Sequence, residues 1–143
     1  VFSCDSGLYL RSHADGQPLP AGEQPGIHVR GVAGRYTDDE LLAHYIGLVR
    51  KYGQIRARYK NAICLIWNER LRAESMAEDL WGSPFLLTDK PHAKRVEGFP
   101  LDSISLDIKT GRYCYDLEEN SQDDLVSQRG FAGFFEDFLK TAR

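Results

Sequence analysis

Three short segments carry the side chains best suited to chemistry, and the first is Cys4–Leu8, Cys-Asp-Ser-Gly-Leu. We expect Val1–Cys4 to be the end of a buried strand, which would place Asp5 at the strand's carboxyl end, where open α/β sheets bind ligands. A carboxylate there can hold Mg²⁺ or orient a water toward phosphorus. Ser6 and Gly7 would let backbone N–H groups approach a phosphate closely. The alternative is an ordinary Asp-Ser-Gly turn.

The second segment is Gly98–Ser103, Gly-Phe-Pro-Leu-Asp-Ser. An exposed Phe99 beside a glycine could stack on a base. Asp102 could accept hydrogen bonds from ring N–H groups or stand near a metal. In the alternative interpretation, the loop buries Phe99 in the core just before a strand that starts at Ile104.

The third segment is Ser127–Gly130, Ser-Gln-Arg-Gly. We expect it to open the last helix with Ser127 as the N-cap, so that free N–H groups and the helix dipole favour an anionic or electron-rich ligand. Arg129 in a first helical turn opposes the dipole preference for acids. An arginine can donate to O6 and N7 of a 6-oxopurine, as it does when it reads guanine. The alternative is a surface arginine.

The elements that position these segments can be predicted from periodicity and capping. Residues 12–35 are rich in Gly and Pro and predict a long loop. Thr37 and Glu40 have capping-box spacing before a helix that should end at Gly53. Phe131, Phe134, Phe135 and Phe138 share one stripe of the last helix and are expected in the core.

Strands are predicted between the helices. The apolar run Ala62–Trp67 predicts a central strand that is covered on both faces. It should turn at Asn68-Glu69 into an antiparallel partner. That partner is predicted at Arg70–Ala77. A short strand is predicted at Pro84–Leu87, a half-buried strand at Ile104–Ile108, and its hairpin partner at Arg112–Leu117.

Composition limits the class of protein. The chain has 143 residues, 42% apolar and 27% charged, which fits one globular domain over residues 1–143. A net charge of −3 does not favour non-specific nucleic-acid or membrane binding, so we expect no nucleic acid and no membrane as partners. Three cysteines without paired spacing argue against a disulfide scaffold and a structural zinc site. Without a signal peptide or an apolar stretch near 20 residues, a cytoplasmic protein is expected.

Taken together and in order, the three segments resemble the inosine triphosphate pyrophosphatase family, which removes non-canonical purine nucleoside triphosphates. That family has an Asp-Asp-Ser-Gly-Leu segment after a strand, a Pro-Gly loop, a Gly-Phe-Gly-Tyr-Asp segment before a strand, and a Ser-His-Arg-Gly segment that opens the last helix. The counterparts here are Cys4–Leu8, Pro25-Gly26, Gly98–Asp102 and Ser127–Gly130. They follow the family order over nearly the whole chain.

The resemblance implies an α/β fold in which a mixed β-sheet is flanked by helices in an elongated, two-lobed shape, and it implies a homodimer. It also implies hydrolysis of the triphosphates of inosine, deoxyinosine or xanthosine (ITP, dITP, XTP) to the monophosphate and pyrophosphate, with Mg²⁺ as cofactor. Asp5 would orient the water or bind the metal. Phe99 would stack on the base, Asp102 and Arg129 would recognise the 6-oxopurine edge, and Ser127 and Gln128 would complete the base pocket.

The sequence departs from the family pattern at several points. Cys4 replaces the first acid, Pro100-Leu101 replaces Gly-Tyr, and Gln128 replaces the histidine, although Gln also donates and accepts hydrogen bonds. The family's N-terminal strand, its phosphate loop and an upstream metal-binding acid would precede Val1, so we expect an N-terminally truncated or a diverged member. The basic residues to consider as phosphate contacts or as solvated surface groups are Arg30, Lys90, Lys94 and Arg95.

Three hypotheses follow from these residues. A purine nucleoside triphosphate pyrophosphatase, or the larger part of one, predicts that Asp5, Phe99, Asp102 and Arg129 converge on one cleft. A non-catalytic nucleotide-binding module, or an inactive fragment of such an enzyme, predicts base binding without pyrophosphate release. An interaction domain without a nucleotide site predicts scattered side chains and an exposed apolar patch.

Overall fold

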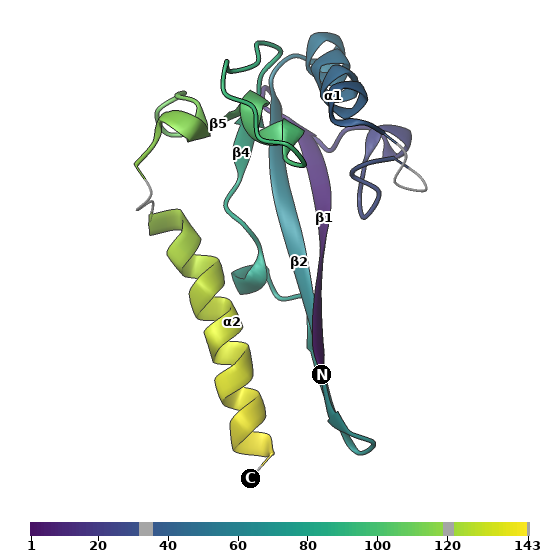
Figure 1. Cartoon of the computed structure of the whole chain (residues 1–143), viewed down its shortest axis with the longest axis vertical. Coiled ribbons are helices and arrows are strands. Elements are labelled where there is room, and N and C mark those ends of the chain that lie inside the picture. The colour runs from purple at the N-terminus through teal and green to yellow at the C-terminus, as the bar shows by residue number, and fades with distance from the viewer. Residues whose placement is uncertain (32–35, 119–121, 143) are drawn as a thin grey trace.

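The computed structural model describes residues 1–31, 36–118 and 122–142. A five-stranded sheet runs through the molecule and is flanked by two α-helices (Figure 1). The strands are β1 (Phe2–Ser12), β2 (Ile55–Asn68), β3 (Leu71–Ser75), β4 (Phe85–Leu87) and β5 (Ser105–Leu106). The helices are α1 (Asp38–Tyr52) and α2 (Gln122–Thr141). Residues 32–35, the end of the predicted long loop, lie outside the described residues.

β2 is the central strand of the sheet. It pairs with β1 along the whole length of β1, from Phe2 opposite Leu65 to Ser12 opposite Ile55. On its other side it pairs with β3 at one end and with β4 at the other, and β4 pairs with β5. The predicted α/β fold with helices beside a sheet is confirmed, and every strand pair in the described residues is antiparallel where a mixed sheet was expected.

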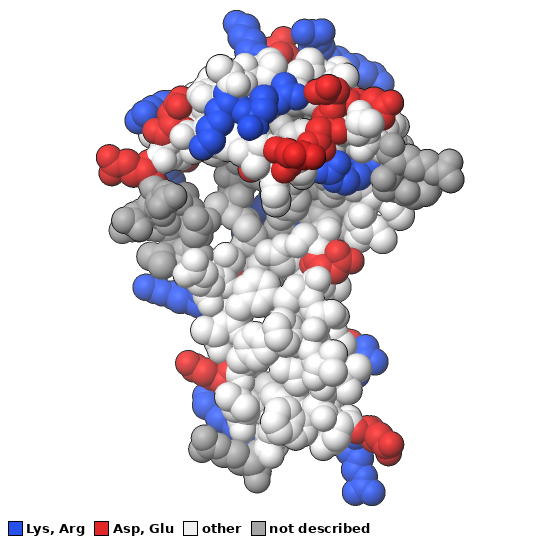
Figure 2. All heavy atoms as spheres, in the orientation of Figure 1, with Lys and Arg blue, Asp and Glu red and all other residues white. Residues whose placement is uncertain are grey.

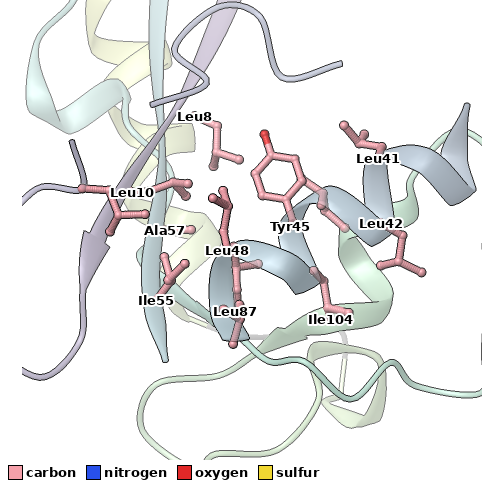
Figure 3. Packing of buried hydrophobic residues seen from close by; sticks show 13 residues of the cluster. Leu8, Leu10, Leu41, Leu42, Tyr45, Leu48, Ile55, Ala57, Leu87 and Ile104 are labelled. Carbon is pink, nitrogen blue, oxygen red and sulfur yellow. The ribbon is translucent and has the colours of Figure 1, made fainter. Parts of the chain in front are cut away.

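One end of the sheet, with α1, forms what we call the packed end. It comprises α1, residues 7–12 of β1, residues 55–59 of β2, β4 and the 3₁₀ helix Pro100–Ile104. Thr37 and Glu40 form the predicted capping box and Gly53, with φ 76°, ends α1. The apolar stripe of α1 packs onto β1 and β2 (Figure 3). The buried core cluster formed there includes Leu8, Leu10, Tyr45, Ile55 and Leu87.

The opposite end, with α2, forms what we call the distal end: residues 1–6 of β1, residues 61–68 of β2, β3 and α2. Aromatic contacts join α2 to the sheet. The ring centroids of Phe135 and Phe2 lie 5.6 Å apart, and those of Phe138 and Trp67 lie 6.3 Å apart. Phe138 is buried as predicted, whereas the other three phenylalanines of the stripe are half-buried. In Figure 2 most charged side chains gather over the packed end, and the surface below it is largely uncharged.

Of the two strands predicted after the second segment, one is shorter than expected and the other forms only a single bridge. Only Ser105–Leu106 forms a strand, because the hydroxyls of Ser103 and Ser105 donate to the carbonyls of Pro100 and Leu101 and so hold Pro100–Ile104 as a 3₁₀ helix. Residues 112–117 contribute one bridge, at Tyr113, and then curl into another 3₁₀ helix, Cys114–Asp116.

One prediction about the central strand also needs correction. β2 is covered on both faces only in part, because it extends past the elements that pack on it and leaves Ile66 and Trp67 exposed. The predicted turn after β2 and its antiparallel partner are confirmed, with β3 covering Leu71–Ser75. Among the described residues, no helix is both long and apolar enough to cross a bilayer.

Candidate functional site

Asp5 lies in the middle of β1, opposite Ala62 of β2. The expectation that a buried strand ends at Cys4 is therefore wrong: the strand continues to Ser12, and Val1–Ser6 are exposed. The Asp5 carboxylate accepts a hydrogen bond from the N–H of Ser6 at 2.8 Å. It lines an open hollow of about 490 Å³ on the sheet face, together with Ser3, Cys64, Glu74 and neighbouring residues.

Ser6 and Gly7 have contacts within the fold. The Ser6 hydroxyl donates to the side-chain oxygen of Asn61 on β2 at 2.6 Å. A Cβ at Gly7 would come within 3.2 Å of the backbone of Gly26, because the Pro25-Gly26 loop adds to the edge of β1 through two hydrogen bonds between Leu8 and Gly26. A close approach of two backbones thus accounts for a glycine at position 7.

The Gly98–Asp102 segment is held at the packed end by a charged network. The Asp38 carboxylate, at the start of α1, accepts from the Gly98 N–H at 2.7 Å and from the Arg30 guanidinium at 2.9 Å. Arg30 also donates to the Gly98 carbonyl at 2.6 Å. The Gly98 hydrogen bond, and then the Arg30 hydrogen bond, hold the pKa of Asp38 below its usual range. Arg30 therefore positions this loop.

Phe99 and Asp102 lie together on this loop. Phe99 is 62% exposed, so the alternative in which it is buried before the strand is excluded. Gly98 has φ 83°, a conformation that glycine adopts without strain, and Pro100 then starts the 3₁₀ helix. The Asp102 N–H donates to the Phe99 carbonyl at 3.3 Å. The exposed ring of Phe99 and the carboxylate of Asp102 thus lie one helical turn apart on the surface.

The Asp102 carboxyl group is partly desolvated although the residue as a whole is exposed, and this desolvation raises its pKa. Its charge adds to the effect of burial in raising the pKa values of Tyr59 and Tyr115, so both phenols lie near it. The Tyr115 hydroxyl is removed from water and has no hydrogen-bond partner among the described residues.

The Ser127–Gly130 segment does not open the last helix. α2 begins at Gln122, so Ser127 is inside the helix and is not the predicted N-cap. The argument from free N–H groups therefore fails for this segment, while Gln128 and Arg129 are exposed and Ser127 is half-buried. Gly130 is buried, and a Cβ there would collide with the carbonyl oxygen of Asp79. Close packing of α2 on the chain after β3 accounts for this glycine.

The pyrophosphatase hypothesis predicted that Asp5, Phe99, Asp102 and Arg129 converge on one cleft, and the structure brings together only two of the four. Phe99 and Asp102 share one turn, and Asp102 lies near Tyr59, whose side chain packs against the core. Tyr59 pairs with Leu8, and Asp5, three residues from Leu8, projects from the other face of the sheet. Within the described part of the chain, no contact joins Asp5 or Arg129 to the Phe99–Asp102 turn.

The residues that line the Asp5 hollow can be compared with the ligands that Mg²⁺ prefers. Protein sites for Mg²⁺ commonly use one or two carboxylates and leave the other positions to water and substrate phosphates. Asp5 and Glu74 line the same hollow, so the donor type fits. In the described ranges, no group of three or more His, Cys, Asp or Glu side chains is arranged to hold a metal.

Sequence reasoning overlooked a row of basic residues on β2, Arg56, Arg58 and Lys60, which lies on the same sheet face as Asp5. The signal was present in the sequence as Arg-Ala-Arg-Tyr-Lys, a basic residue at every second position of a strand. Of the basic residues first considered, Arg30 and Arg95 are paired with Asp38 and Asp39 at the start of α1.

Two solved structures share this arrangement of strands and helices. The Ham1 protein of Staphylococcus aureus is 18% identical, with a TM-score of 0.59 over 100% of this chain and 68% of that chain. A HAM1 protein from Coxiella burnetii is 19% identical, with a TM-score of 0.59 over 99% of this chain and 67% of that chain. No family model matches the sequence, and no curated protein is significantly similar to it. The chain thus has the fold of Ham1 proteins, which are members of the inosine triphosphate pyrophosphatase family.

Proposed function

We propose that the protein is a nucleoside triphosphate pyrophosphatase that hydrolyses non-canonical purine nucleotides, ITP, dITP or XTP, to the monophosphate and pyrophosphate. The observation that carries the proposal is the Ham1 fold together with an exposed Phe99 one turn from a partly desolvated Asp102. Fold alone does not define chemistry. The sequence segments that resemble the family and the placement of this pair supply the second argument.

Recognition of a 6-oxopurine is assigned to the second segment. The Phe99 ring would stack on the base, and the Asp102 carboxylate would accept a hydrogen bond from the ring N1–H. Adenine has an acceptor at N1, so it would meet a second acceptor and bind poorly. Because the pKa of Asp102 is raised and the ionised form is needed, this recognition should be lost on acidification at a higher pH than for an ordinary aspartate. Ser127, Gln128 and Arg129 remain proposed contacts of the purine edge.

The hydrolytic step is assigned to Asp5. Its carboxylate would hold Mg²⁺ or orient the attacking water at the α-phosphorus. A bound magnesium ion would neutralise charge that develops on the phosphate oxygens. Asp5 is exposed on an open hollow that a triphosphate and water can enter. The sheet separates this hollow from Phe99 and Asp102, so the catalytic role of Asp5 and the base contacts are tested by separate variants.

The test is pyrophosphate release from dITP, XTP and ATP with Mg²⁺, comparing the wild type with Asp5→Asn. We expect release from the 6-oxopurines, and a loss on the order of a hundredfold or more in the variant, the usual effect of removing a catalytic acid or base. Asp137→Asn is the matched control, since Asp137 is an exposed residue of α2 that pairs with Lys140. Equal release from dITP and ATP, or full activity in Asp5→Asn, would contradict the proposal.

A non-catalytic purine-nucleotide-binding module is the second candidate. It is favoured by Cys4 in place of the first acid and by the sheet that separates Asp5 from Asp102. It predicts that dITP binds and that Phe99→Ala weakens this binding, with no release of pyrophosphate from the wild type. Homodimerisation, which the resemblance implies, and a cytoplasmic location, which was expected from the sequence, remain proposals.

A further inference from the structure

The basic row on β2 lies on the face turned away from the core. Arg56, Arg58 and Lys60 alternate with Ala57 and Tyr59, whose side chains pack into or against the core cluster. Successive side chains of a strand point to opposite faces, so the three cations share the outer face. They are spaced two residues apart along an extended backbone and can contact successive groups of one ligand.

The basic row forms one wall of a hollow, and neighbouring segments form the rest of its lining. On β1, Tyr9 pairs with Arg58 and Arg11 pairs with Arg56, which adds a ring and a fourth cation to the same face. The hollow has a volume of about 560 Å³, a size typical of small-molecule sites. Its other side is formed by Glu78 and Trp81, from the chain after β3.

Two of the cationic side chains, Lys60 and Arg58, are held in place by contacts within the protein. The Lys60 ammonium lies 4.4 Å from the ring centroid of Tyr9 and 4.6 Å from that of Trp81. The Arg58 guanidinium lies 5.1 Å from the Trp81 ring and donates to the Gly82 carbonyl at 2.8 Å. Cation–π contacts and this hydrogen bond restrict both side chains, so less conformational entropy is lost when an anion binds.

Positive charge exceeds negative charge in the hollow. Its lining includes four cationic side chains and one carboxylate, a surplus of three positive charges in a chain whose net charge is −3. The single carboxylate, Glu78, is paired with Arg58 at 2.8 Å. This pair leaves the charges of Arg11, Arg56 and Lys60 to be balanced by a multivalent anion.

The loop that follows β1 borders the hollow. Pro18, Leu19 and Gln24 of this loop are among the lining residues. The Gln24 amide fixes the loop, since it donates to the carbonyls of Leu10 and Leu19 at 2.7 and 3.0 Å and accepts from the Leu10 N–H at 2.9 Å. This border of the hollow is therefore held in place by hydrogen bonds to β1.

We propose that this hollow is a polyphosphate-binding site, which takes a chain of two or three phosphates, either free or as the tail of a nucleotide. Arg56, Arg58 and Lys60 would each contact a phosphate, with Arg11 beside Arg56 as a fourth cation. The binding claim does not depend on hydrolysis and so goes beyond the proposed function. Asp5 lies on the same face, two residues from Gly7, which pairs with Lys60. Phe99 and Asp102 lie across the sheet from this face, so a nucleotide whose tail binds the row would not have its base at Phe99.

The test is calorimetric titration of the chain with inorganic tripolyphosphate at low salt. Lys60→Gln and Arg56→Gln should each weaken binding about tenfold, the effect of losing one charge-assisted hydrogen bond. Glu78→Gln should strengthen it, because the one competing carboxylate is removed. This opposite sign separates a ligand contact from a structural role, since loss of the Glu78–Arg58 pair as a fold contact would not improve binding. Arg70→Gln, an exposed arginine in the turn after β2, removes the same charge elsewhere and should leave binding unchanged.

Competition with dITP distinguishes the two sources of the ligand. Displacement of tripolyphosphate by dITP assigns the site to a nucleotide tail, and failure to displace it assigns the site to free polyphosphate. Wild-type affinity in both Lys60→Gln and Arg56→Gln, or an equal loss in Arg70→Gln, would overturn the proposal. If the protein binds tripolyphosphate but releases no pyrophosphate from dITP, only the proposed enzyme activity is rejected. If it hydrolyses dITP while Lys60→Gln and Arg56→Gln both keep wild-type affinity for tripolyphosphate, only this binding site is rejected.

Discussion

The packed end and the distal end of the molecule bury their apolar side chains to different extents. At the packed end α1 and two strands enclose a continuous cluster in which Leu8, Ile55 and Leu87 are fully buried. At the distal end a single helix meets the sheet through aromatic edges, and Trp67 and Leu139 remain exposed. The difference indicates that the packed end supplies most of the stability, whereas the distal end leaves several apolar side chains exposed.

The largest expected effect tests where stability resides. Leu87→Ala, at a residue with 0% exposure, should lower the free energy of unfolding by about 2–5 kcal/mol, because it removes buried methyl groups and leaves a cavity. Leu139→Ala, at a residue with 51% exposure on α2, should cost less than about 1 kcal/mol. Urea unfolding of both variants measures the contrast. Equal losses would contradict the division into two ends.

The second prediction tests how α2 is held at the distal end. Gly130→Ala should cost about 1–3 kcal/mol, because the new methyl group would push α2 away from the Asp79 carbonyl. Gly133→Ala is the matched control: its methyl group would meet nothing within 4 Å, and alanine favours a helix, so a gain of up to about 1 kcal/mol is expected. Thermal unfolding compares the two, and a neutral Gly130→Ala would show that this close contact is dispensable.

The third prediction concerns acid sensitivity at the packed end. The pKa of Asp38 is lowered in the folded state, so its contribution to stability is present above the unfolded pKa of about 3.9 and is lost as the pH falls through the folded value. Asp38→Asn should therefore be less stable than the wild type at pH 7, and the difference should shrink below about pH 4. Urea midpoints at both pH values measure this. A pH-independent difference would mean that charge is not the cause.

The smallest effect on stability is expected at Phe99. Its ring is exposed, so Phe99→Ala should change the free energy of unfolding by no more than about 0.5 kcal/mol. If the ring stacks on a base, the same change should weaken dITP binding by about 1–3 kcal/mol. Unfolding and titration of one variant separate the two effects, and unchanged affinity would remove Phe99 from the base site.

Local sequence determined the elements whose signals are short-range. The capping box of Thr37 and Glu40, the helix stop at Gly53 and the turn after Asn68 were predicted at the right positions, because each depends on residues within one turn. The start of α2 was missed by six residues: an N-cap at Ser127 predicts Gln128 as the first helical residue, whereas the helix begins at Gln122. Element boundaries depend on competing local options that residue type alone does not rank.

The placement of the candidate residues came from tertiary structure. The sequence predicted the α/β fold of this chain, and it indicated Phe99 and Asp102 as neighbours in one short segment. Only strand register decided that Asp5 shares a sheet face with Arg56, Arg58 and Lys60 and lies across the sheet from Asp102. A one-residue change of register reverses every side chain, and long-range pairing sets that register.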